Sequence, residues 1–371
     1  MTANKFLASI AGFIDRFIPK DKSIVVFSGN NLHGINGNVA SVIHEWPINP
    51  ITRNLDGYVL SLKNERFDGL KTINPGTIKG LLILLRAYTI VLSHGPGDIY
   101  WKTLAQPSER RIINLWHGMP LKKIGPFKGW GSTVIIASSL IERLALASCF
   151  KIDLDKIIVT GFPRTDQIIR CQKELKKAAL DKLNRKEEPQ KWVLYAPTYR
   201  KNINSPAYLH NLPDFSSEEL ERVLEENNAY LIFRYHINQP VSSFPKSKRF
   251  IFAHFDLFPD IDPLYALADI LITDYSSSIF EYLLLNRPII GLASDLEEYS
   301  KITGFLFDYG SIFPGPIAAN WRDMKVFLIE AIKNPSANTL LRKDRLRLFH
   351  HYLDGFSIER CINIICNMKI K

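Results

Sequence analysis

The sequence predicts two α/β domains in series, each built around a parallel β-sheet. Short apolar segments rich in β-branched residues alternate with helix-like stretches, a pattern typical of parallel sheets covered by helices. The alternation stops between Gln172 and Lys191, where Lys and Glu dominate, and then starts again. The chain of 371 residues is also longer than one core usually fills, so two domains are expected.

The first 22 residues are expected to form an amphipathic helix, because apolar side chains recur there at helical spacing. Such a helix could cover the body of the protein, or it could lie in a membrane interface. Periodicity alone does not separate these two interpretations, and both stay open. The apolar positions of the pattern are Phe6, Ile10, Phe13, Ile14 and Phe17.

The first domain, residues 23–185, contains six expected strands. Each is a short apolar segment that ends in polar or turn residues, as buried strands that feed loops do. Ligands of open parallel sheets bind beyond the carboxyl ends of the strands, so the polar residues after each segment are candidate site residues. The six segments are Ser23–Asn30, Gly57–Leu62, Thr89–Ser93, Arg111–Leu115, Thr133–Ala137 and Lys156–Thr160.

The second domain, residues 186–345, repeats this pattern with five expected strands. Residues 346–371 are expected to form a C-terminal helix, and packing of that helix back on the first domain is one option. With two such domains, the expected ligand site is the cleft between them. The five segments are Trp192–Ala196, Tyr230–Tyr235, Phe250–Phe252, Ile270–Thr273 and Pro288–Gly291.

The charge of the chain narrows its possible partners. The 47 Lys and Arg against 37 Asp and Glu give a net charge of +10, which suggests nucleic acid, an anionic membrane or a phosphate-rich substrate. There is no aromatic-basic RNA motif and no concentrated basic arm, so no nucleic-acid partner is expected. No uncharged apolar run reaches the roughly 18 residues that span a bilayer. The 4 cysteines lack metal-ligand spacing and are expected to be reduced thiols of a cytoplasmic protein.

The segment Trp116–Lys123 follows the expected strand that ends at Leu115. His117 therefore falls at a strand's carboxyl end, where Gly118 frees the backbone. A neutral imidazole there can take a proton from a hydroxyl group. The alternative is a core histidine bonded to a carbonyl group, but the flanking Gly, Pro and lysines favour a functional role.

Three further strand ends carry basic or hydroxyl side chains. In Gly161–Asp166, Arg164 could bind a phosphate or a carboxylate, or pair with a neighbour in a plain turn. Thr198 and Arg200 could bind phosphate, with a simple strand-end turn as the alternative. Arg234 and His236 suit a diphosphate, and the alternative for Arg234 is a salt bridge to an acidic neighbour. The three motifs that contain these residues are Gly161–Asp166, Tyr195–Arg200 and Phe233–His236.

The most specific motif runs from Ala268 to Tyr282. A buried strand leads into Thr273 and Asp274, and three serines then open a helix. Backbone N–H groups and serine hydroxyls can form an anion site without a glycine-rich loop, although plain helix capping is the alternative. Glu281 could accept hydrogen bonds from a ribose or polyol hydroxyl. The acidic residues of this region are scattered, so no metal site is expected.

Taken together and in this order, the motifs resemble the CDP-glycerol glycerophosphotransferase family, the polyol-phosphate transferases of teichoic acid and capsule synthesis. The resemblance extends over about residues 23 to 320. The matching segments are Trp116–Lys122, Gly161–Asp166, Tyr195–Arg200, Arg234–His236, Thr273–Ser277 and Asn286–Pro288.

The resemblance implies a GT-B-like fold, with two Rossmann-type domains facing a central cleft. It implies transfer of a polyol phosphate from a CDP-polyol such as CDP-glycerol to a hydroxyl group of a lipid-linked or oligosaccharide acceptor, with release of CMP. A cationic pocket for the diphosphate could do without magnesium, so no metal or other cofactor is expected. Separately from the resemblance, the basic net charge and the N-terminal helix suggest a cytoplasmic protein that docks at the anionic inner face of the membrane, where a lipid-linked acceptor would lie.

The resemblance also implies roles for individual residues. His117 would be the general base, and His236 would complete the catalytic pair by contacting the donor phosphates. The implied acceptor-side residues are Gly118, Lys122 and Lys123. Ser276 and Ser277 would bind the donor phosphates, and Glu281 would contact the nucleotide ribose or the polyol. From their residue types and their places at strand ends, we expect Arg164, Thr198, Arg200 and Arg234 to bind the same phosphates, and Thr273 and Asp274 to contact the nucleotide or polyol.

Two departures from the family pattern concern the substrates. The family often has Thr where this chain has Met119, and Pro where it has Ile237. These differences put the acceptor and the polyol in doubt more than the reaction class. The alternatives are a GT-B glycosyltransferase that uses a nucleotide-sugar donor, which the same fold could host, and an inactive scaffold, which the intact motifs make a poor explanation.

Overall fold

The computed structural model describes residues 2–29, 32, 34–63, 65–101, 104, 110–125, 133–186, 190–200, 205, 208–235 and 247–367, with side chains from Ser9 onward. The chain forms two compact units. The first comprises Met1–Met119, Gly125–Asp166 and His350–Lys371, and the second comprises Pro120–Ile124 and Gln167–Phe349. The units therefore divide after Asp166 and Phe349, where the sequence suggested divisions after residues 185 and 345. The predicted cleft between the domains stays a prediction.

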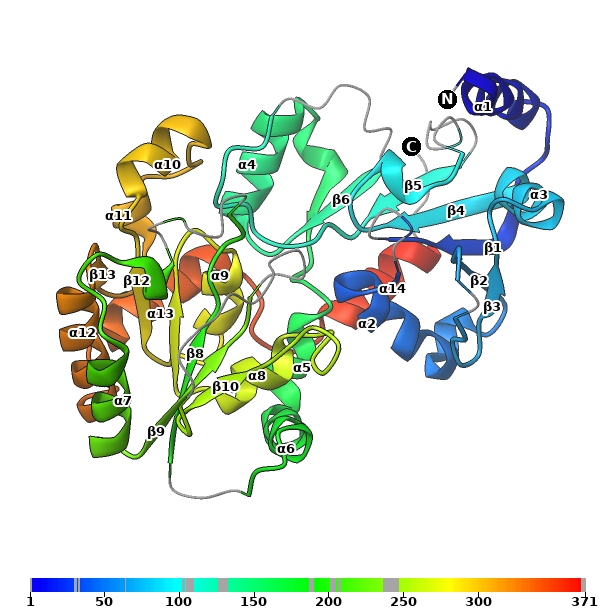
Figure 1. Ribbon diagram of the computed structural model, residues 1–371. Coiled ribbons are helices and arrows are strands. Elements are labelled where there is room, and N and C mark those ends of the chain that lie inside the picture. The colour runs from blue at the N-terminus through cyan, green and yellow to red at the C-terminus, as the bar shows by residue number, and fades with distance from the viewer. Residues whose placement is uncertain are drawn as a thin grey trace. The chain divides into compact units, whose positions relative to one another are not determined.

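The first unit is built on a seven-stranded sheet in the order β3-β2-β1-β4-β5-β6-β7 (Figure 1). Every pairing in it is parallel, as the alternation of strands and helices predicts. The strand β3 was not predicted, because it has only three residues and lies at the sheet edge. The strands are β1 Asp21–Phe27, β2 Asp56–Leu60, β3 Lys71–Ile73, β4 Ala87–Leu92, β5 Arg111–Asn114, β6 Val134–Ala137 and β7 Ile157–Val159.

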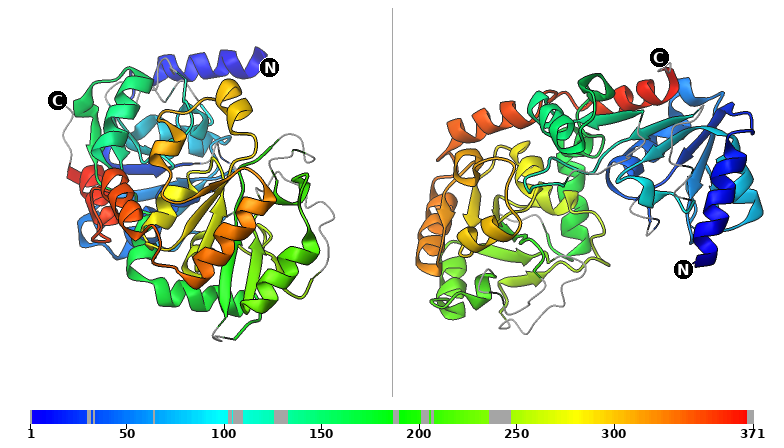
Figure 2. Two further views of the ribbon diagram at one scale, coloured as in Figure 1. Left: turned by 90° about the vertical axis from the view of Figure 1, so that its left-hand side faces the viewer. Right: turned by 90° about the horizontal axis from the view of Figure 1, so that it is seen from above.

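Helices from both ends of the chain belong to this unit. The C-terminal helix α14 packs beside α2 (Figures 1 and 2). The Ile358 N–H donates to the buried Asp166 carboxylate at 2.8 Å. This bond and the buried apolar side chains of α14 join the last residues to the first unit. The helices are α1 Thr2–Asp15, α2 Gly37–Glu45, α3 Ile78–Arg86, α4 Leu140–Phe150 and α14 Ser357–Asn367, while α5, Thr165–Arg170, spans the division between the units.

The second unit has a six-stranded parallel sheet in the order β10-β9-β8-β11-β12-β13. The helices α7 and α12 pack side by side on one face and form a continuous apolar core with the strands (Figures 1 and 2). The two-residue strand β13 was not predicted. The strands are β8 Lys191–Tyr195, β9 Ala229–Phe233, β10 Phe250–Phe252, β11 Ile270–Thr273, β12 Ile289–Leu292 and β13 Ile317–Ala318.

The helices of the second unit connect these strands. Their bounds are α6 Gln172–Lys182, α7 Ser217–Glu226, α8 Asp262–Leu267, α9 Ser278–Leu283, α10 Leu296–Ile302, α11 Tyr309–Ile312, α12 Trp321–Lys333 and α13 Thr339–Phe349.

A short segment between two parts of the first unit also belongs to the second. Lys122 forms an antiparallel bridge with Phe305. Lys123 N–H donates to the Gly304 carbonyl at 3.2 Å, and Leu306 N–H donates to the Leu121 carbonyl at 3.0 Å. The motif that contains His117 therefore begins in one unit and ends in the other.

The N-terminal helix α1 is fixed at its end by a buried ionic network. The Asp15 carboxylate contacts Lys20 Nζ at 2.8 Å and the fully buried guanidinium of Arg110. Arg110 also donates to the Leu84 carbonyl of α3 at 2.9 Å. No helix within the described residues is long and apolar enough to span a membrane.

We predict that Asp15→Asn lowers the free energy of unfolding by about 3–5 kcal/mol, because it leaves the buried Arg110 charge without its partner. The matched control is Asp56→Asn, which breaks an exposed pair with Lys71 at 2.9 Å. That change should cost less than about 1 kcal/mol. Urea unfolding followed by circular dichroism measures both, and equal losses in the two variants would contradict a buried network.

Candidate functional site

His117 lies just beyond the carboxyl end of β5, as predicted. The neighbouring strand β4 pairs with β5 in the register Leu92↔Asn114, so the residues after the two strands lie side by side. This register brings together the rings of His94 and His117, which stack with centroids 4.3 Å apart and planes 11° apart. His94 was not among the site residues predicted from the sequence.

The backbone around His117 adopts unusual conformations. Trp116 has φ of 49°, in the left-handed region, and Gly118 has φ of 141°. A left-handed Trp costs of order 1–3 kcal/mol and persists only where neighbours hold it. Here Asn38 Nδ2 donates to the carbonyls of Leu115 and Trp116 at 2.8 and 3.0 Å, while Asn114 Oδ1 accepts the Trp116 N–H at 2.8 Å.

The imidazole of His117 is fixed in one orientation. Its Nδ1 lies 3.4 Å from the Ser93 carbonyl oxygen, which can only accept a hydrogen bond, so Nδ1 carries the hydrogen and Nε2 has a lone pair that can accept a proton. The residue is exposed, but His94 and Trp116 flank its ring. The resulting loss of hydration, together with the neighbouring His94, lowers the pKa of His117 to about 4.

Arg164 follows β7 and is the other predicted site residue of the first unit. Its N–H donates to Asn38 Oδ1 at 3.2 Å, so one asparagine side chain joins the Arg164 turn to the His117 loop. The positive charge of Arg164 contributes to the lowered pKa of His117. Arg164, Gly118 and His117 are therefore brought together in one unit.

In the second unit, three predicted residues meet beyond the ends of β8 and β11. The Asp274 carboxylate accepts the Thr198 N–H at 2.7 Å and lies 3.0 Å from a guanidinium nitrogen of Arg200. Asp295, which the sequence analysis missed, contacts the same guanidinium at 3.2 Å. The side chain of Arg200 is thus held between two carboxylates.

Two tyrosine rings complete the surroundings of Arg200. The guanidinium carbon lies 5.1 Å from the ring centre of Tyr275 and 4.8 Å from that of Tyr299. Burial lowers the pKa of Arg200, but Asp274 and Asp295 outweigh burial and the net shift is upward. The prediction that Arg200 binds a phosphate is not tested by this arrangement, which already balances its charge.

Two predicted hydroxyl groups differ in their surroundings. Thr198 is only 9% exposed, and no described residue forms a hydrogen bond with its Oγ1. Thr273 is fully buried, and its hydroxyl donates to the Ala196 carbonyl at 2.7 Å. Thr198 therefore has a hydroxyl available for a ligand, whereas Thr273 uses its hydroxyl to join β11 to the end of β8.

The serines that open α9 are only partly available. The Ser276 hydroxyl donates to Ser278 Oγ at 2.9 Å and accepts the Ser278 N–H at 3.2 Å. Ser277 occupies the N-cap position without forming a side-chain cap bond. Glu281 lies on the first turns of α9 and is buried. Contact of these residues with a donor stays a prediction.

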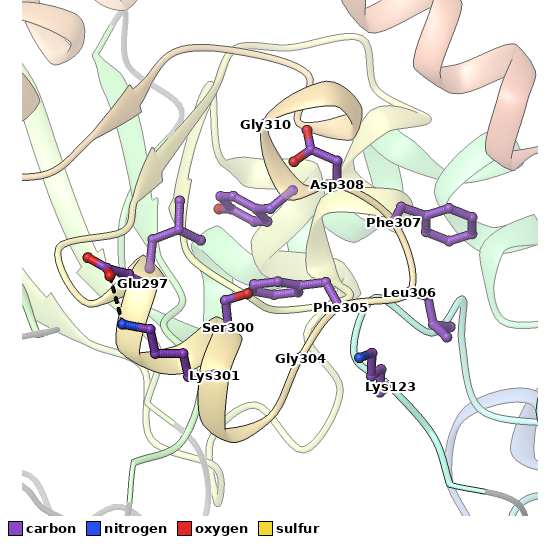
Figure 3. Close-up of a pocket in the computed structure, with 12 residues that line it drawn as sticks. Lys123, Glu297, Ser300, Lys301, Gly304, Phe305, Leu306, Phe307, Asp308 and Gly310 are labelled. Atoms are coloured by element: carbon purple, nitrogen blue, oxygen red, sulfur yellow. Dashed lines mark hydrogen bonds and ion pairs between the residues drawn. The ribbon is translucent and has the colours of Figure 1, made fainter.

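Lys122 and Lys123 belong to the second unit and Gly118 belongs to the first, and all three were predicted to serve the acceptor. Lys122 Nζ lies 5.8 Å from the ring centre of Tyr299, and burial lowers its pKa. Lys123 lines a depression of about 760 Å³ between α10 and the loop Gly304–Asp308, where Glu297 pairs with Lys301 at 2.7 Å (Figure 3). Their acceptor-side role stays a prediction.

Arg234 stabilises a loop. It is buried, its Nη1 donates to the Ala253 carbonyl at 3.1 Å, and its guanidinium carbon lies 5.1 Å from the ring centre of Phe255. Burial lowers the pKa of Arg234. His236, predicted to act beside it, lies outside the described residues. The described part of the chain contains no cluster of three or more His, Cys, Asp or Glu side chains that could hold a metal ion.

Curated relatives are bacterial cell-wall polymer enzymes. The chain is 31% identical over 282 residues to a teichoic acid poly(ribitol-phosphate) polymerase of Bacillus spizizenii, a match that covers 68% of this chain and 43% of that protein. It is 30% identical over 282 residues to a teichoic acid glycerol-phosphate transferase of Staphylococcus aureus, which covers 69% of each chain. The match thus spans less than half of the first relative.

Solved structures share the fold. The wall teichoic acid polymerase TagF superposes with a TM-score of 0.78 at 20% identity, over 96% of this chain and 92% of that one. A putative UDP-N-acetylglucosamine 2-epimerase from Listeria monocytogenes gives 0.59 at 13% identity, over 92% and 95% of the two chains. These matches confirm the predicted GT-B-like class of two parallel-sheet α/β domains.

The family model described as CDP-glycerol:poly(glycerophosphate) glycerophosphotransferase matches residues 10–367, a longer stretch than the motifs alone suggested. The match includes both units and every motif described above. The chain is therefore a member of the CDP-glycerol:poly(glycerophosphate) glycerophosphotransferase family.

Proposed function

We propose that this protein transfers a polyol phosphate from a CDP-activated donor to a hydroxyl group on a lipid-linked or polymeric glycan and releases CMP, in teichoic acid or capsule synthesis. Glycerol phosphate is the first candidate, in line with the family. The observation that carries the proposal is the exposed His117 imidazole at a strand's carboxyl end, with Nδ1 held by the Ser93 carbonyl.

The proposed chemistry needs one proton transfer and one displacement. His117 Nε2 accepts the proton of the acceptor hydroxyl, whose oxygen forms a bond to the β-phosphorus of the donor. The bond from that phosphorus to the bridging oxygen breaks, and CMP leaves with the electron pair. His117 is neutral at pH 7 because its pKa is about 4, and the negative charge of a bound donor would raise that pKa toward the working range of a base.

On the donor side, the Thr198 hydroxyl and the Lys122 ammonium group are the contacts that we propose for the diphosphate. The Thr198 hydroxyl has no partner among the described residues, and Lys122 is near Asp274 and Arg200. Because Arg200 already contacts two carboxylates, we propose that it orients Asp274, which in turn holds the Thr198 backbone.

The reaction is tested by incubating the protein with CDP-glycerol, CDP-ribitol and UDP- or GDP-sugars in the presence of candidate acceptors. We expect CMP release from a CDP-polyol, and His117→Ala should lower that rate by ~10²–10⁴ because the general base is missing. Donor binding, measured by isothermal titration calorimetry, should persist in this variant.

The matched control is His44→Ala, since the side chain of His44 is 78% exposed on α2, and it should retain full activity. Loss of donor binding in His117→Ala would contradict its assignment as the base. Turnover of nucleotide sugars alone would replace the proposed reaction with glycosyl transfer.

We predict that Thr198→Val weakens donor binding about tenfold without loss of stability, because its hydroxyl forms no hydrogen bond within the described protein. Thr273→Val is the matched control. It should lose about 1 kcal/mol of stability with its hydrogen bond to Ala196 and keep its donor affinity. Calorimetric titration measures the donor affinity of both variants, and thermal unfolding measures their stability. Unchanged donor affinity together with lost stability in Thr198→Val would exclude Thr198 as a donor contact.

We also propose that α1 docks on the anionic inner face of the membrane. Phe13 on this helix and Phe17 in the turn directly after it are 64% and 71% exposed, and the net charge of +10 favours anionic lipid. Deleting the helix would also remove the buried Asp15, so side-chain changes are the better test.

The double variant Phe13→Ser, Phe17→Ser should therefore lose most of its flotation with liposomes of anionic phospholipid. The control variant Phe356→Ser changes an aromatic residue that is half exposed in another part of the same unit, and it should float like the unmodified protein. Unchanged flotation of the double variant would exclude α1 as the membrane contact.

A further inference from the structure

We propose that His94 is a positioning residue for the general base. Its ring orients His117, and as the pH falls it takes the first proton of the histidine pair, whose charge then disfavours protonation of His117. The catalytic consequence rests on the proposed function, whereas orientation and order of protonation are properties of the protein without substrate.

The two rings are held by adjacent strand ends. Stacking at 4.3 Å and 11° covers one side of His117, and the Trp116 ring, 4.1 Å away by centroids, contacts the imidazole as well. A ring held by two aromatic neighbours loses rotational freedom. Removing His94 would therefore free His117 to turn away from the Ser93 carbonyl.

Hydrogen bonds to a buried carboxylate fix the backbone of the loop that carries His94. The completely buried Asp98 carboxylate accepts the N–H groups of Ser93 and His94 at 2.9 and 2.7 Å. The Asp98 backbone carbonyl in turn accepts a hydrogen bond from the hydroxyl group of Ser28, which follows β1. His94 is thus fixed to the sheet through its backbone, independently of its side chain.

Ser93 links the two imidazoles. Its carbonyl oxygen fixes the Nδ1–H tautomer of His117, while its hydroxyl oxygen lies 2.7 Å from Nδ1 of His94. The open Nε2 of His117 is the atom that the proposed reaction requires. A change at His94 therefore reaches His117 through the stacked ring and through the shared serine.

The charged groups near His94 differ from those near His117. Asp98 Oδ1 lies 3.8 Å from Nδ1 of His94 and raises the pKa of that ring, although burial gives a net lowering. For His117, loss of hydration, His94 and Arg164 all lower the pKa, while the Ser93 carbonyl and Asp98 raise it. Two stacked cations repel each other. As the pH falls, His94 should therefore be protonated first and His117 only near pH 4.

The test uses two variants of the full chain. His94→Phe keeps an aromatic ring stacked on His117 but removes the group that can become positively charged. His94→Ala removes both the ring and the charge. The control is His44→Phe, at the exposed histidine of α2. Nitrogen-15 NMR of histidine-labelled protein without substrate reports the tautomer and the titration of His117 directly.

In His94→Phe we expect His117 to be protonated at higher pH than in the unmodified protein, with the Nδ1–H tautomer kept. In His94→Ala we expect a mixture of tautomers. The acid limb of kcat/KM should move upward in His94→Phe, because only neutral His117 accepts the proton, and kcat in His94→Ala should fall about tenfold with KM unchanged.

An unchanged titration and tautomer of His117 in both variants would overturn the proposal, as would protonation of His117 before His94. If His94→Ala does not fold, the His94→Phe titration still decides the question. If the NMR shifts occur but no CDP-polyol is turned over, the proposed function fails and the positioning role stands.

Discussion

The carboxamide of Asn38 connects the parts of the first unit that chemistry would need to keep together. Its Nδ2 donates to two successive carbonyls of the His117 loop, and its Oδ1 accepts the N–H of Arg164. Without these bonds the left-handed Trp116 would lack its support. Asn38, at the start of α2, therefore supports the backbone that leads into His117, together with the bond from the Trp116 N–H to Asn114.

In the second unit, ion pairs and aromatic rings hold the residues beyond the strand ends in place. Two carboxylates and two tyrosine rings enclose Arg200, and the backbone of Thr198 is held by Asp274. The enclosed charge is balanced locally, so this cluster contributes fixed geometry more than excess positive potential. A phosphate at this end of the sheet would meet oriented donors such as the Thr198 hydroxyl, which cost little reorganisation when a ligand binds.

Much of the fold could be predicted from the sequence, because buried parallel strands are continuous apolar segments. The strands β3 and β13 could not, since three and two residues carry no periodic signal. The rule that sites follow the carboxyl ends of strands selected His117 and Thr198, and the structure places both residues just beyond β5 and β8. It applied equally to His94, which follows β4 and precedes a glycine, and this residue was overlooked.

The partners of the basic side chains could not be predicted in the same way. Arg200 and Arg234 were selected as phosphate ligands from their residue type and their place at strand ends. Their contacts with Asp274, Asp295 and the Ala253 carbonyl join residues between 19 and 95 positions apart, which only the folded chain reveals. Asn38 was missed for the same reason, since an amide at a helix start has no signature of its own.

The contact between Asp15 and Arg110, which anchors the N-terminal helix, also limits how far this anchor can lie from His117. Arg110, which binds Asp15, immediately precedes β5, and His117 lies seven residues further along the chain. An extended chain advances by at most about 3.6 Å per residue, so roughly 25 Å is the upper limit between the Cα atoms of Arg110 and His117. For an enzyme resting on lipid by this helix, that short spacer would set the height at which a lipid-borne hydroxyl group must present itself.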